Sequence, residues 1–224
     1  MANLFSDGFE GGNLNAWNGG ADTDGGDLAA TTAAKLHGNY GLACLIDDTT
    51  SIAVWDSTPT TAKRYRIRFY FDPHTITMGT NGQLGLFRAM GDGWDDTCYV
   101  MLQYTTVYTI YILNTTDTTY SWSSNYTITD APHCIEMDWK ASTAPGANNG
   151  FMSLWIDGVL QGTIANIDND TKNIGFIGIG AQNVSSGISG TFFLDDFASN
   201  NDGSEIGVIA EAPAGNAIMM GINL

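Results

Sequence analysis

The stretch KRYRIRFYFD, residues 63–72, decides the fold class. Every second side chain is apolar and those between are arginines or a tyrosine: Tyr65, Ile67, Phe69 and Phe71 on one face, Arg64, Arg66, Arg68 and Tyr70 on the other. Successive side chains of a strand point to opposite faces, so this alternation predicts a β-strand with one face in a hydrophobic core.

Similar short runs recur along the whole chain. They are YGLACLI (40–46), SIAVWD (51–56), QLGLFRAM (83–90), TCYVMLQY (97–104), VYTIYIL (107–113), CIEMDWK (134–140), FMSLWIDG (151–158), NIGFIGIG (173–180) and TFFLDDFA (191–198). Clusters of Gly, Asn and Asp separate them, and no window of helical length keeps a 3.6-residue period. Many short strands with such turns predict a β-sandwich or barrel, and LWIDGVLQG (154–162) predicts a tight hairpin turning at Asp157-Gly158.

Composition excludes some classes of partner. The chain has 224 residues, a length that one all-β domain commonly reaches. Its net charge of -16 repels phosphate backbones and anionic lipid, so nucleic acid and membrane surfaces are not expected partners. Only 14% of the residues are charged, and the surface coat of Thr, Ser, Asn and Gly that this implies is typical of virion-surface or extracellular proteins.

Cysteine usage and the first residues bear on the compartment. Cys44, Cys98 and Cys134 each lie in an apolar run without metal-ligand spacing. They are therefore either buried free thiols or one disulfide with one thiol left over. The opening MANLFSDGFE lacks the features of a signal peptide, and no run is apolar enough for a membrane span. Either a leader was removed or the protein leaves the cell by another route, such as lysis.

The chain changes character after about residue 203. We expect a jelly-roll β-sandwich over residues 1–203 and an apolar tail over residues 204–224, which alternates poorly and contains Pro213. Two interpretations of the tail stay open. It packs on its own domain, or it docks on a neighbouring subunit, as in a homo-oligomer or a larger surface assembly, through Ile218, Met219, Met220 and Ile222.

Five segments together resemble the concanavalin A-like or laminin G-like jelly rolls. They are FSDGFEGGNLNAW (5–17), LHGNYGLAC (36–44), RYRIRFYF (64–71), MSLWIDGVLQG (152–162) and FFLDDFA (192–198). The resemblance covers about residues 4–198 and implies an all-β fold of two antiparallel sheets. It says little of function, because this fold serves lectins, glycanases, adhesins and phage structural proteins alike.

The resemblance also implies a structural calcium ion. In similar carbohydrate-binding jelly rolls the opening Glu and a closing-strand Asp share this ion, which corresponds to Glu10 and Asp196 here, with Asp7 and Asp195 as further ligands. Carboxylates and backbone carbonyls supply the six to eight oxygens that calcium takes. The alternative is that these are ordinary acidic residues of an acidic protein.

CIEMDWK places Glu136, Asp138 and Lys140 on one face of a strand. Related glycanases use a Glu-x-Asp-x-Glu pattern, whose paired carboxylates act as nucleophile and acid/base. Because Lys140 stands in the third position, a glycoside hydrolase is only a remote alternative. We expect instead that the two carboxylates pair with the arginines of residues 64–68 as a charge ladder. A polar sugar-binding groove on that sheet stays open as the other interpretation.

The loop AMGDGWDDT (89–97) combines an aromatic platform with hydrogen-bond acceptors. A sugar offers an apolar face for stacking and hydroxyls for hydrogen bonds, so the predicted glycan-binding residues are Trp94, Asp92, Asp95, Asp96 and, from another strand, Trp155. The simpler interpretation is a Gly-Asp turn anchored by one tryptophan. The three histidines show no zinc-ligand spacing, and no nucleophile or nucleotide motif is present.

Two functional hypotheses follow. The first is a non-enzymatic structural or interaction protein, displayed on a phage virion among other assembly subunits and able to hold glycans. The second is a secreted, calcium-stabilised carbohydrate-binding module.

Overall fold

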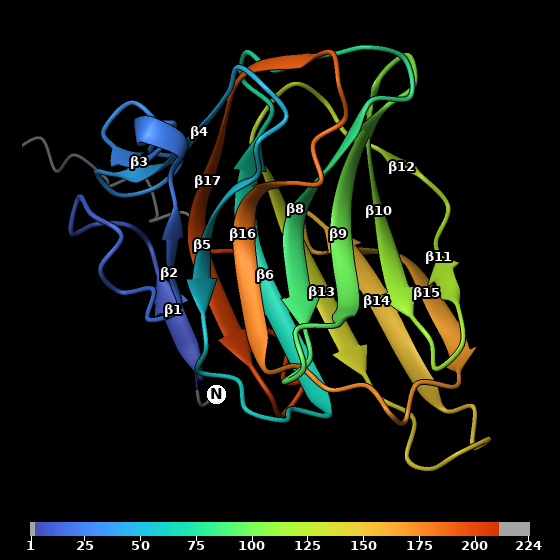
Figure 1. The fold of residues 1–224 in the computed structure, drawn as a ribbon. Coiled ribbons are helices and arrows are strands. Elements are labelled where there is room, and N and C mark those ends of the chain that lie inside the picture. The colour runs from blue at the N-terminus through green and yellow to red at the C-terminus, as the bar shows by residue number, and fades with distance from the viewer. Residues whose placement is uncertain (1–2, 211–224) are drawn as a thin grey trace, which may run out of the picture.

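A computed structural model describes residues 3–210 as two antiparallel sheets packed face to face. Sheet A has the order β15 (Val159–Ile167), β14 (Gly150–Ile156), β13 (His133–Lys140), β6 (Arg64–Asp72), β17 (Ile188–Asn200), β4 (Gly41–Ile46) and β3 (Leu28–Thr31), with β1 (Phe5–Asp7) and β7 (Thr77–Met78) also on β17. Sheet B has the order β11 (Tyr120–Trp122), β10 (Tyr108–Thr115), β9 (Asp96–Tyr104), β8 (Gln83–Met90), β16 (Phe176–Gln182), β5 (Ile52–Asp56) and β2 (Gly20–Asp22), with β12 (Tyr126–Thr127) on β10. Figure 1 shows sheet B in front of sheet A. The predicted jelly-roll β-sandwich is confirmed.

The core lies between the two sheets, where the alternation of residues 63–72 placed it. Tyr65, Ile67, Phe69 and Phe71 are all 0% exposed and belong to one continuous apolar cluster. Burying such a side chain contributes about 1.5–3 kcal/mol to the free energy of unfolding. The only helix in the described part of the chain is a 3-10 turn at Asp24–Gly26, and no helix there is long and apolar enough to cross a membrane.

The opening and closing segments meet in sheet A. β1 pairs with β17 in the register Phe5↔Ser199, and Leu4 donates its N–H to the Ser199 carbonyl over 2.8 Å. Trp17 packs edge-on against Phe5, with ring centroids 4.9 Å apart, and lies 5.2 Å from Phe197. The aromatic residues near both ends of the chain therefore form one cluster that closes the sandwich.

The predicted hairpin is confirmed between β14 and β15. Ile156 pairs with Val159, which leaves Asp157 and Gly158 as the two turn residues. Their φ angles are 53° and 75°. A two-residue turn with both φ angles positive matches the right-handed twist of the strands, which explains the Asp-Gly sequence.

β17 contains a β-bulge between Asp195 and Ala198. Asp196 has a φ of 48°, which is uncommon for a residue with a side chain. In a regular strand Asp195 and Asp196 would face opposite sides, because neighbouring strand residues alternate. The bulge breaks this alternation, and both carboxylates contact the same loop, at His37.

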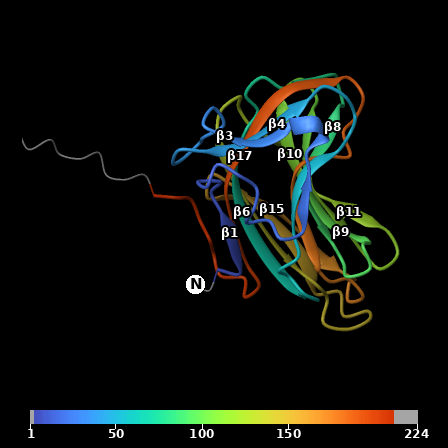
Figure 2. The ribbon, with the colours of Figure 1, turned by 60° about the vertical axis from the view of Figure 1, so that its left-hand side comes forward.

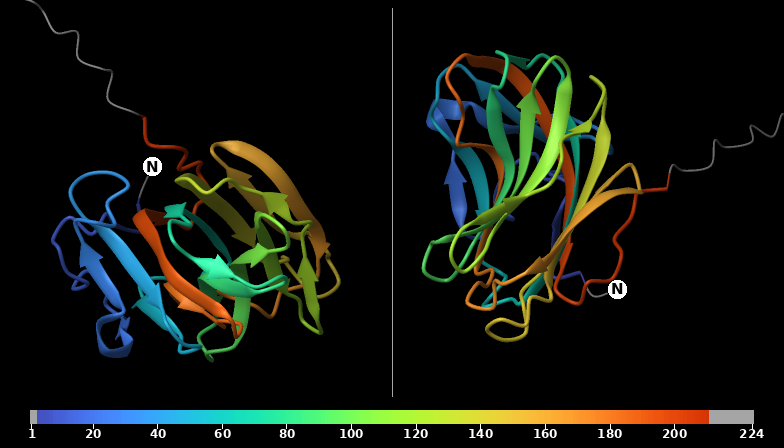
Figure 3. Two further views of the ribbon diagram at one scale, coloured as in Figure 1. Left: turned by 90° about the horizontal axis from the view of Figure 1, so that it is seen from above. Right: turned by 90° about the vertical axis from the view of Figure 1, so that its right-hand side faces the viewer.

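Residues 203–209, called the strap here, run over the outer face of sheet A (Figures 2 and 3). They form no strand. Ile206 and Gly207 donate their N–H groups to Glu136, each over 3.0 Å, and Ile209 donates to the Tyr70 hydroxyl over 2.8 Å. This part of the predicted tail packs on its own domain. Residues 218–222, proposed for docking, lie outside the described residues.

The three cysteines are buried free thiols, which is the first of the two alternatives that the sequence left open. Burial raises the pKa of each thiol.

Candidate functional site

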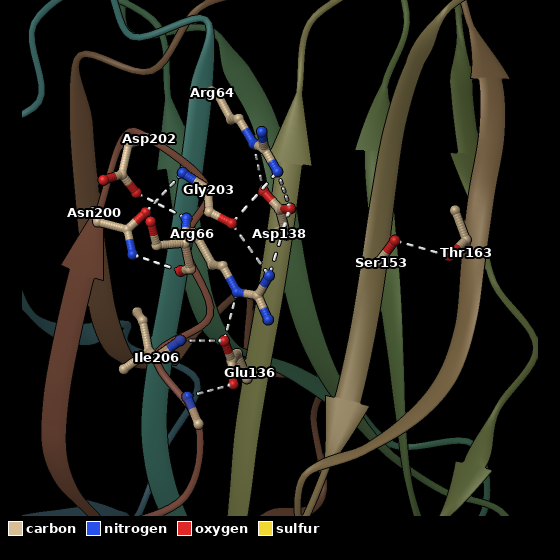
Figure 4. Close-up of polar contacts among 12 residues, drawn as sticks. Arg64, Arg66, Glu136, Asp138, Ser153, Thr163, Asn200, Asp202, Gly203 and Ile206 are labelled. Atoms are coloured by element: carbon tan, nitrogen blue, oxygen red, sulfur yellow. Dashed lines mark hydrogen bonds and ion pairs between the residues drawn. The ribbon is translucent and has the colours of Figure 1, made fainter. Parts of the chain in front are cut away.

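The outer face of sheet A carries the predicted charge ladder (Figure 4). Arg64 pairs with Asp138 at 2.8 Å and Arg66 pairs with Glu136, so each ion pair joins residues diagonal to one another. Glu136 and Asp138 are nearly fully buried. Their oxygens are occupied by the arginines and, for Glu136, by the strap. A sugar could not reach this carboxylate pair without displacing the strap.

Sheet B presents a different outer face, where aromatic side chains line a groove. At one end the indole of Trp55 lies over Gly178 of the neighbouring strand, and a Cβ at Gly178 would come within 2.5 Å of that ring. Trp94 stacks on Phe176 with ring centroids 4.3 Å apart and an interplanar angle of 22°. Trp94 remains 63% exposed. These two indoles line a hollow of about 590 Å³ together with Arg88.

The middle of the groove combines an ion pair with an apolar floor. Arg88 and Asp96 pair at 2.6 Å, and the Arg88 guanidinium lies 5.7 Å from the centre of the Tyr99 ring. Tyr99 and Tyr111 belong to a small apolar cluster of their own, separate from the core. The Tyr111 hydroxyl donates to Gln83 over 3.0 Å.

The far end is marked by a second exposed indole, Trp122, which is 67% exposed. It lines a hollow of about 310 Å³ with Gln103 and Asn125, whose side-chain amides bond to each other. Tyr111 and Leu113 line both this hollow and the one in the middle.

These parts form one band across sheet B, called the aromatic groove here. It comprises Trp55, Arg88, Trp94, Asp96, Tyr99, Tyr111 and Trp122. From β5 to β11 the band crosses five strand-to-strand steps, which at about 4.8 Å each gives about 24 Å. That length suits an extended chain of several units better than a single small molecule.

The phenols of the groove act as hydrogen-bond donors at neutral pH. Burial raises the pKa of Tyr99, and its hydrogen bond to the Asp96 carboxylate raises the pKa further. Burial also raises the pKa of Tyr111. Both hydroxyls therefore keep their protons, which they donate to Gln83 and to the Asp96 carboxylate, so the two phenols are fixed parts of the groove floor and poor proton acceptors.

Only some of the predicted glycan-binding residues lie in the aromatic groove. Trp94 and Asp96 lie in the aromatic groove. Asp92 instead accepts a hydrogen bond from Thr61 at 2.9 Å, and Asp95 pairs with Lys172 at 2.9 Å, so both hold loops together. Trp155 lies on sheet A, where the Arg66 guanidinium is 4.4 Å from its ring centre. The prediction that Trp155 belongs to the same glycan-binding site as Trp94 is therefore wrong, because the two indoles lie on different sheets.

Sequence reasoning missed most of the groove, including Trp55, Arg88, Tyr99, Tyr111 and Trp122. In TCYVMLQY (97–104) both faces of the strand are apolar, so alternation could not mark Tyr99 as outward. One signal was available. Gly178 pairs directly with Trp55 and with Arg88, and a glycine inside a strand often marks a close approach by another group.

The residues predicted for calcium lie near one another but serve different bonds. Glu10 accepts N–H donors from Asn39 at 2.8 Å and Tyr40 at 3.2 Å, and these bonds lower its pKa. Asp7 accepts the indole N–H of Trp17 at 2.9 Å. Both carboxylates therefore already have hydrogen-bond donors.

The bulge places Asp195 and Asp196 beside His37, and single side-chain atoms of these three residues lie within 4.8 Å of one another. Asp195 accepts N–H donors from Leu36 and His37. Asp196 Oδ2 and His37 Nδ1 are 2.8 Å apart, yet both are buried without a hydrogen bond among the described residues. An unsatisfied carboxylate oxygen is what a cation site supplies, and calcium shared by Glu10 and Asp196 stays a prediction.

No family model and no curated protein sequence matches the chain. Solved structures do match. The endo-β-1,4-glucuronan lyase of the fungus Trichoderma reesei aligns with a TM-score of 0.64 at 12% identity, over 89% of this chain and 96% of that one. The cellulose induced protein Cip1 aligns with a TM-score of 0.60 at 14% identity, over 88% and 97%. A carbohydrate esterase of the Shiga toxin-encoding bacteriophage phi24B aligns with a TM-score of 0.60 at 13% identity, over 88% and 97%.

At these identities the likeness shows the fold. It also corrects one expectation, that the chain is not an enzyme. Two of the three similar structures are named as enzymes, a lyase and an esterase, so nothing in this fold supports excluding catalysis.

Proposed function

We propose that the protein acts on or recognises carbohydrate, and that a carbohydrate chain binds along the aromatic groove of sheet B. The observation that carries this proposal is the placement of two exposed indoles, Trp94 and Trp122, at opposite ends of one band. Exposed indoles offer flat apolar surfaces to sugar rings. Between them the groove places hydrogen-bonding groups, which give a ligand its orientation.

The charge of the groove favours a neutral carbohydrate. Arg88 is its only cationic side chain among the described lining residues, and Asp96 pairs with it, while Asp22 adds a further carboxylate at the Trp55 end. The protein as a whole carries a charge of -16. A polyanionic chain would therefore meet repulsion and no free cation in the groove.

The similar structures support a role in carbohydrate chemistry, since their names include a glucuronan lyase and a carbohydrate esterase. We therefore include bond cleavage and deacylation in the test of function. The raised pKa of Tyr99 favours a hydrogen-bonding role for this residue, so a proton acceptor would have to come from another group.

The proposal places the protein outside the cell, on a virion surface or as a secreted module. The uncharged polar composition and the phage origin of one similar structure support this placement. Assembly with other subunits through residues 218–222 and a calcium ion at Glu10 and Asp196 remain proposals that accompany it.

The test combines binding and turnover. Affinity gel electrophoresis through a panel of soluble neutral and acidic polysaccharides identifies a ligand, and reducing ends, unsaturated ends and released acyl groups are then assayed in the same mixtures. Trp94→Ala and Trp122→Ala are compared with Trp155→Ala, which removes an indole from the opposite sheet. Each groove variant should lose about 1–2 kcal/mol of binding free energy, or roughly 5- to 30-fold in affinity, because a stacking surface is removed.

The control variant should bind as the wild type does. The proposal fails if no polysaccharide retards the protein. It fails equally if Trp155→Ala weakens binding as much as the two groove variants, because the ligand would then lie on sheet A.

A further inference from the structure

A pocket of about 600 Å³ opens at the end of sheet A where β6 begins and β13 ends. Its cationic wall consists of Lys63, Arg64 and Lys140. Ala62, Ala141, Ala144 and Pro145 supply a small apolar wall. The volume falls within the range of small-molecule sites, which is about 300–1,000 Å³.

The pocket contains several cationic side chains, although the protein as a whole is strongly acidic. The chain has 8 lysines and arginines against 24 aspartates and glutamates. Lys63, Arg64 and Lys140 are three of those cations, and Asp170 is the only acidic side chain that lines the same pocket. The pocket therefore gathers three of the eight cationic side chains of the chain, although Asp138 pairs with Arg64 and Asp170 lies close to Asp117 and Asp168.

Two of the three cations are held in place. Lys63 donates from Nζ to the carbonyls of Asp170 and Lys172 over 2.7 and 2.8 Å. Arg64 is fixed by Asp138 at 2.8 Å. The wall behind them is rigid, because Ala62 exchanges two backbone hydrogen bonds with Ile174, each of 2.9 Å.

Lys140 differs from its two neighbours. It is half-buried at the last position of β13, directly opposite Arg64 in the sheet. Among residues 3–210 no carboxylate lies within 4.0 Å of its ammonium group, and it donates no hydrogen bond there. A cation without a partner beside two pre-positioned cations is suited to pair with an anion that arrives from solution.

We propose that this pocket binds the anionic oxygen group of a small ligand, with Lys140 as its main charge partner and with Arg64 and Lys63 as supporting cations. Carboxylate, sulfate and phosphate groups share the required chemistry. The apolar wall at Ala144 and Pro145 would accommodate the carbon skeleton that carries the group. This site lies on sheet A and is separate from the aromatic groove.

The test is isothermal titration of the full chain with sodium D-glucuronate, sodium sulfate and sodium phosphate, each at constant ionic strength. D-glucose serves as the neutral counterpart of glucuronate. Lys140→Gln removes the unpaired charge and keeps a similar side-chain length. Lys35→Gln makes the same charge change at an exposed lysine elsewhere and is the matched control.

At least one anion should bind saturably to the wild type while glucose does not. Lys140→Gln should weaken that binding by about fivefold, the effect of losing one partly exposed ion pair, and Lys35→Gln should leave it unchanged. Binding of glucuronate alone would identify a carboxylate carried on a sugar, and binding of all three a general oxyanion site.

A second variant guards against indirect effects of the first. Ala144→Asp adds a carboxylate to an exposed loop position in the pocket wall and should abolish anion binding without lowering the melting temperature. The proposal is overturned if none of the three anions binds saturably, or if Lys140→Gln and Lys35→Gln bind alike. Trp94→Ala should leave anion binding unchanged, because Trp94 lies in the aromatic groove and not in this pocket. A failure of the anion proposal can therefore be told apart from a failure of the carbohydrate proposal.

Discussion

Replacing Glu136 by Gln tests whether one buried carboxylate holds the strap on sheet A. Glu136 is 2% exposed. It accepts one charged hydrogen bond from Arg66 and two backbone N–H groups, from Ile206 and Gly207. The amide has a single acceptor oxygen, so at least one N–H donor loses its partner, and the only carboxylate left to Arg66 is that of Asp138, at 3.8 Å.

The expected loss follows from these contacts. A hydrogen bond to a charged group contributes about 1.5–3 kcal/mol, and leaving a donor unsatisfied costs a further 1–3 kcal/mol. Part of this cost disappears if the strap lifts and its N–H groups reach water. We therefore expect Glu136→Gln to lower the free energy of unfolding by about 2–3 kcal/mol, and Glu136→Ala by about 3–5 kcal/mol, the range for breaking a buried ion pair.

Urea unfolding gives the free energy, and amide hydrogen exchange locates the effect. Exchange should speed up at Ile206 and Gly207 while the core strands keep their protection. Glu205→Gln is the control, because it removes a carboxylate from the strap itself at an exposed position. A Glu136→Gln variant with wild-type stability and unchanged exchange at residues 206–207 would refute the reasoning.

Three further predictions concern other parts of the molecule. Burial raises the pKa of Asp56 in the folded state above its unfolded pKa of 3.8. The ionised carboxylate therefore lowers the free energy of unfolding at neutral pH. This loss disappears as the pH falls through the folded pKa, because the carboxyl group of the folded protein becomes protonated. Asp56→Asn should therefore raise the melting temperature at pH 7, and its advantage over the wild type should shrink in scans toward pH 4. Gly178→Ala should cost about 1–3 kcal/mol in urea unfolding, because its Cβ would meet the Trp55 ring at 2.5 Å; it should also weaken carbohydrate binding. If Glu10 and Asp196 share a calcium ion, EDTA should lower the melting temperature of the wild type and leave that of Asp196→Asn unchanged, since an ion bound only to the folded state stabilises it.

Much of the fold could be predicted from the sequence because its strands alternate. Residues 63–72 alternate between apolar and polar side chains because one face packs in the core and the other carries charge. The Asp157-Gly158 sequence is typical of a two-residue hairpin turn. Both signals are local. They depend on neighbours in the chain, which the sequence displays directly.

The bulge at Asp195 and Asp196 shows where such signals end. A single extra residue in β17 changes which face each later side chain takes, and nothing in FFLDDFA marks the position of that residue. The resemblance therefore implied that these acidic residues lie near the opening segment, but strand alternation could not predict that both would contact His37.

The aromatic groove escaped prediction for a different reason. Tyr99 and Tyr111 lie on strands whose outer face is as apolar as the inner one, so hydrophobicity does not distinguish groove from core. Trp55 and Trp122 belong to the same band only because of the order of strands in sheet B. That order depends on contacts between residues far apart in the sequence. The loop of residues 89–97 was recognised because its indole and carboxylates are adjacent in sequence.

The pairing of β1 with β17 and the path of the strap determine which face of the protein lies toward a surface to which it is attached. Residues 3 and 210, the two ends of the described chain, both lie on the sheet A side, as Figures 2 and 3 show. A surface or carrier that holds the chain at residue 3 or residue 210 would therefore face sheet A, and the aromatic groove on sheet B would point away from it. For immobilisation on a sensor chip or fusion to a reporter, tags at either end should leave the groove open to large polymers, whereas coupling through loop 91–95 should obstruct it.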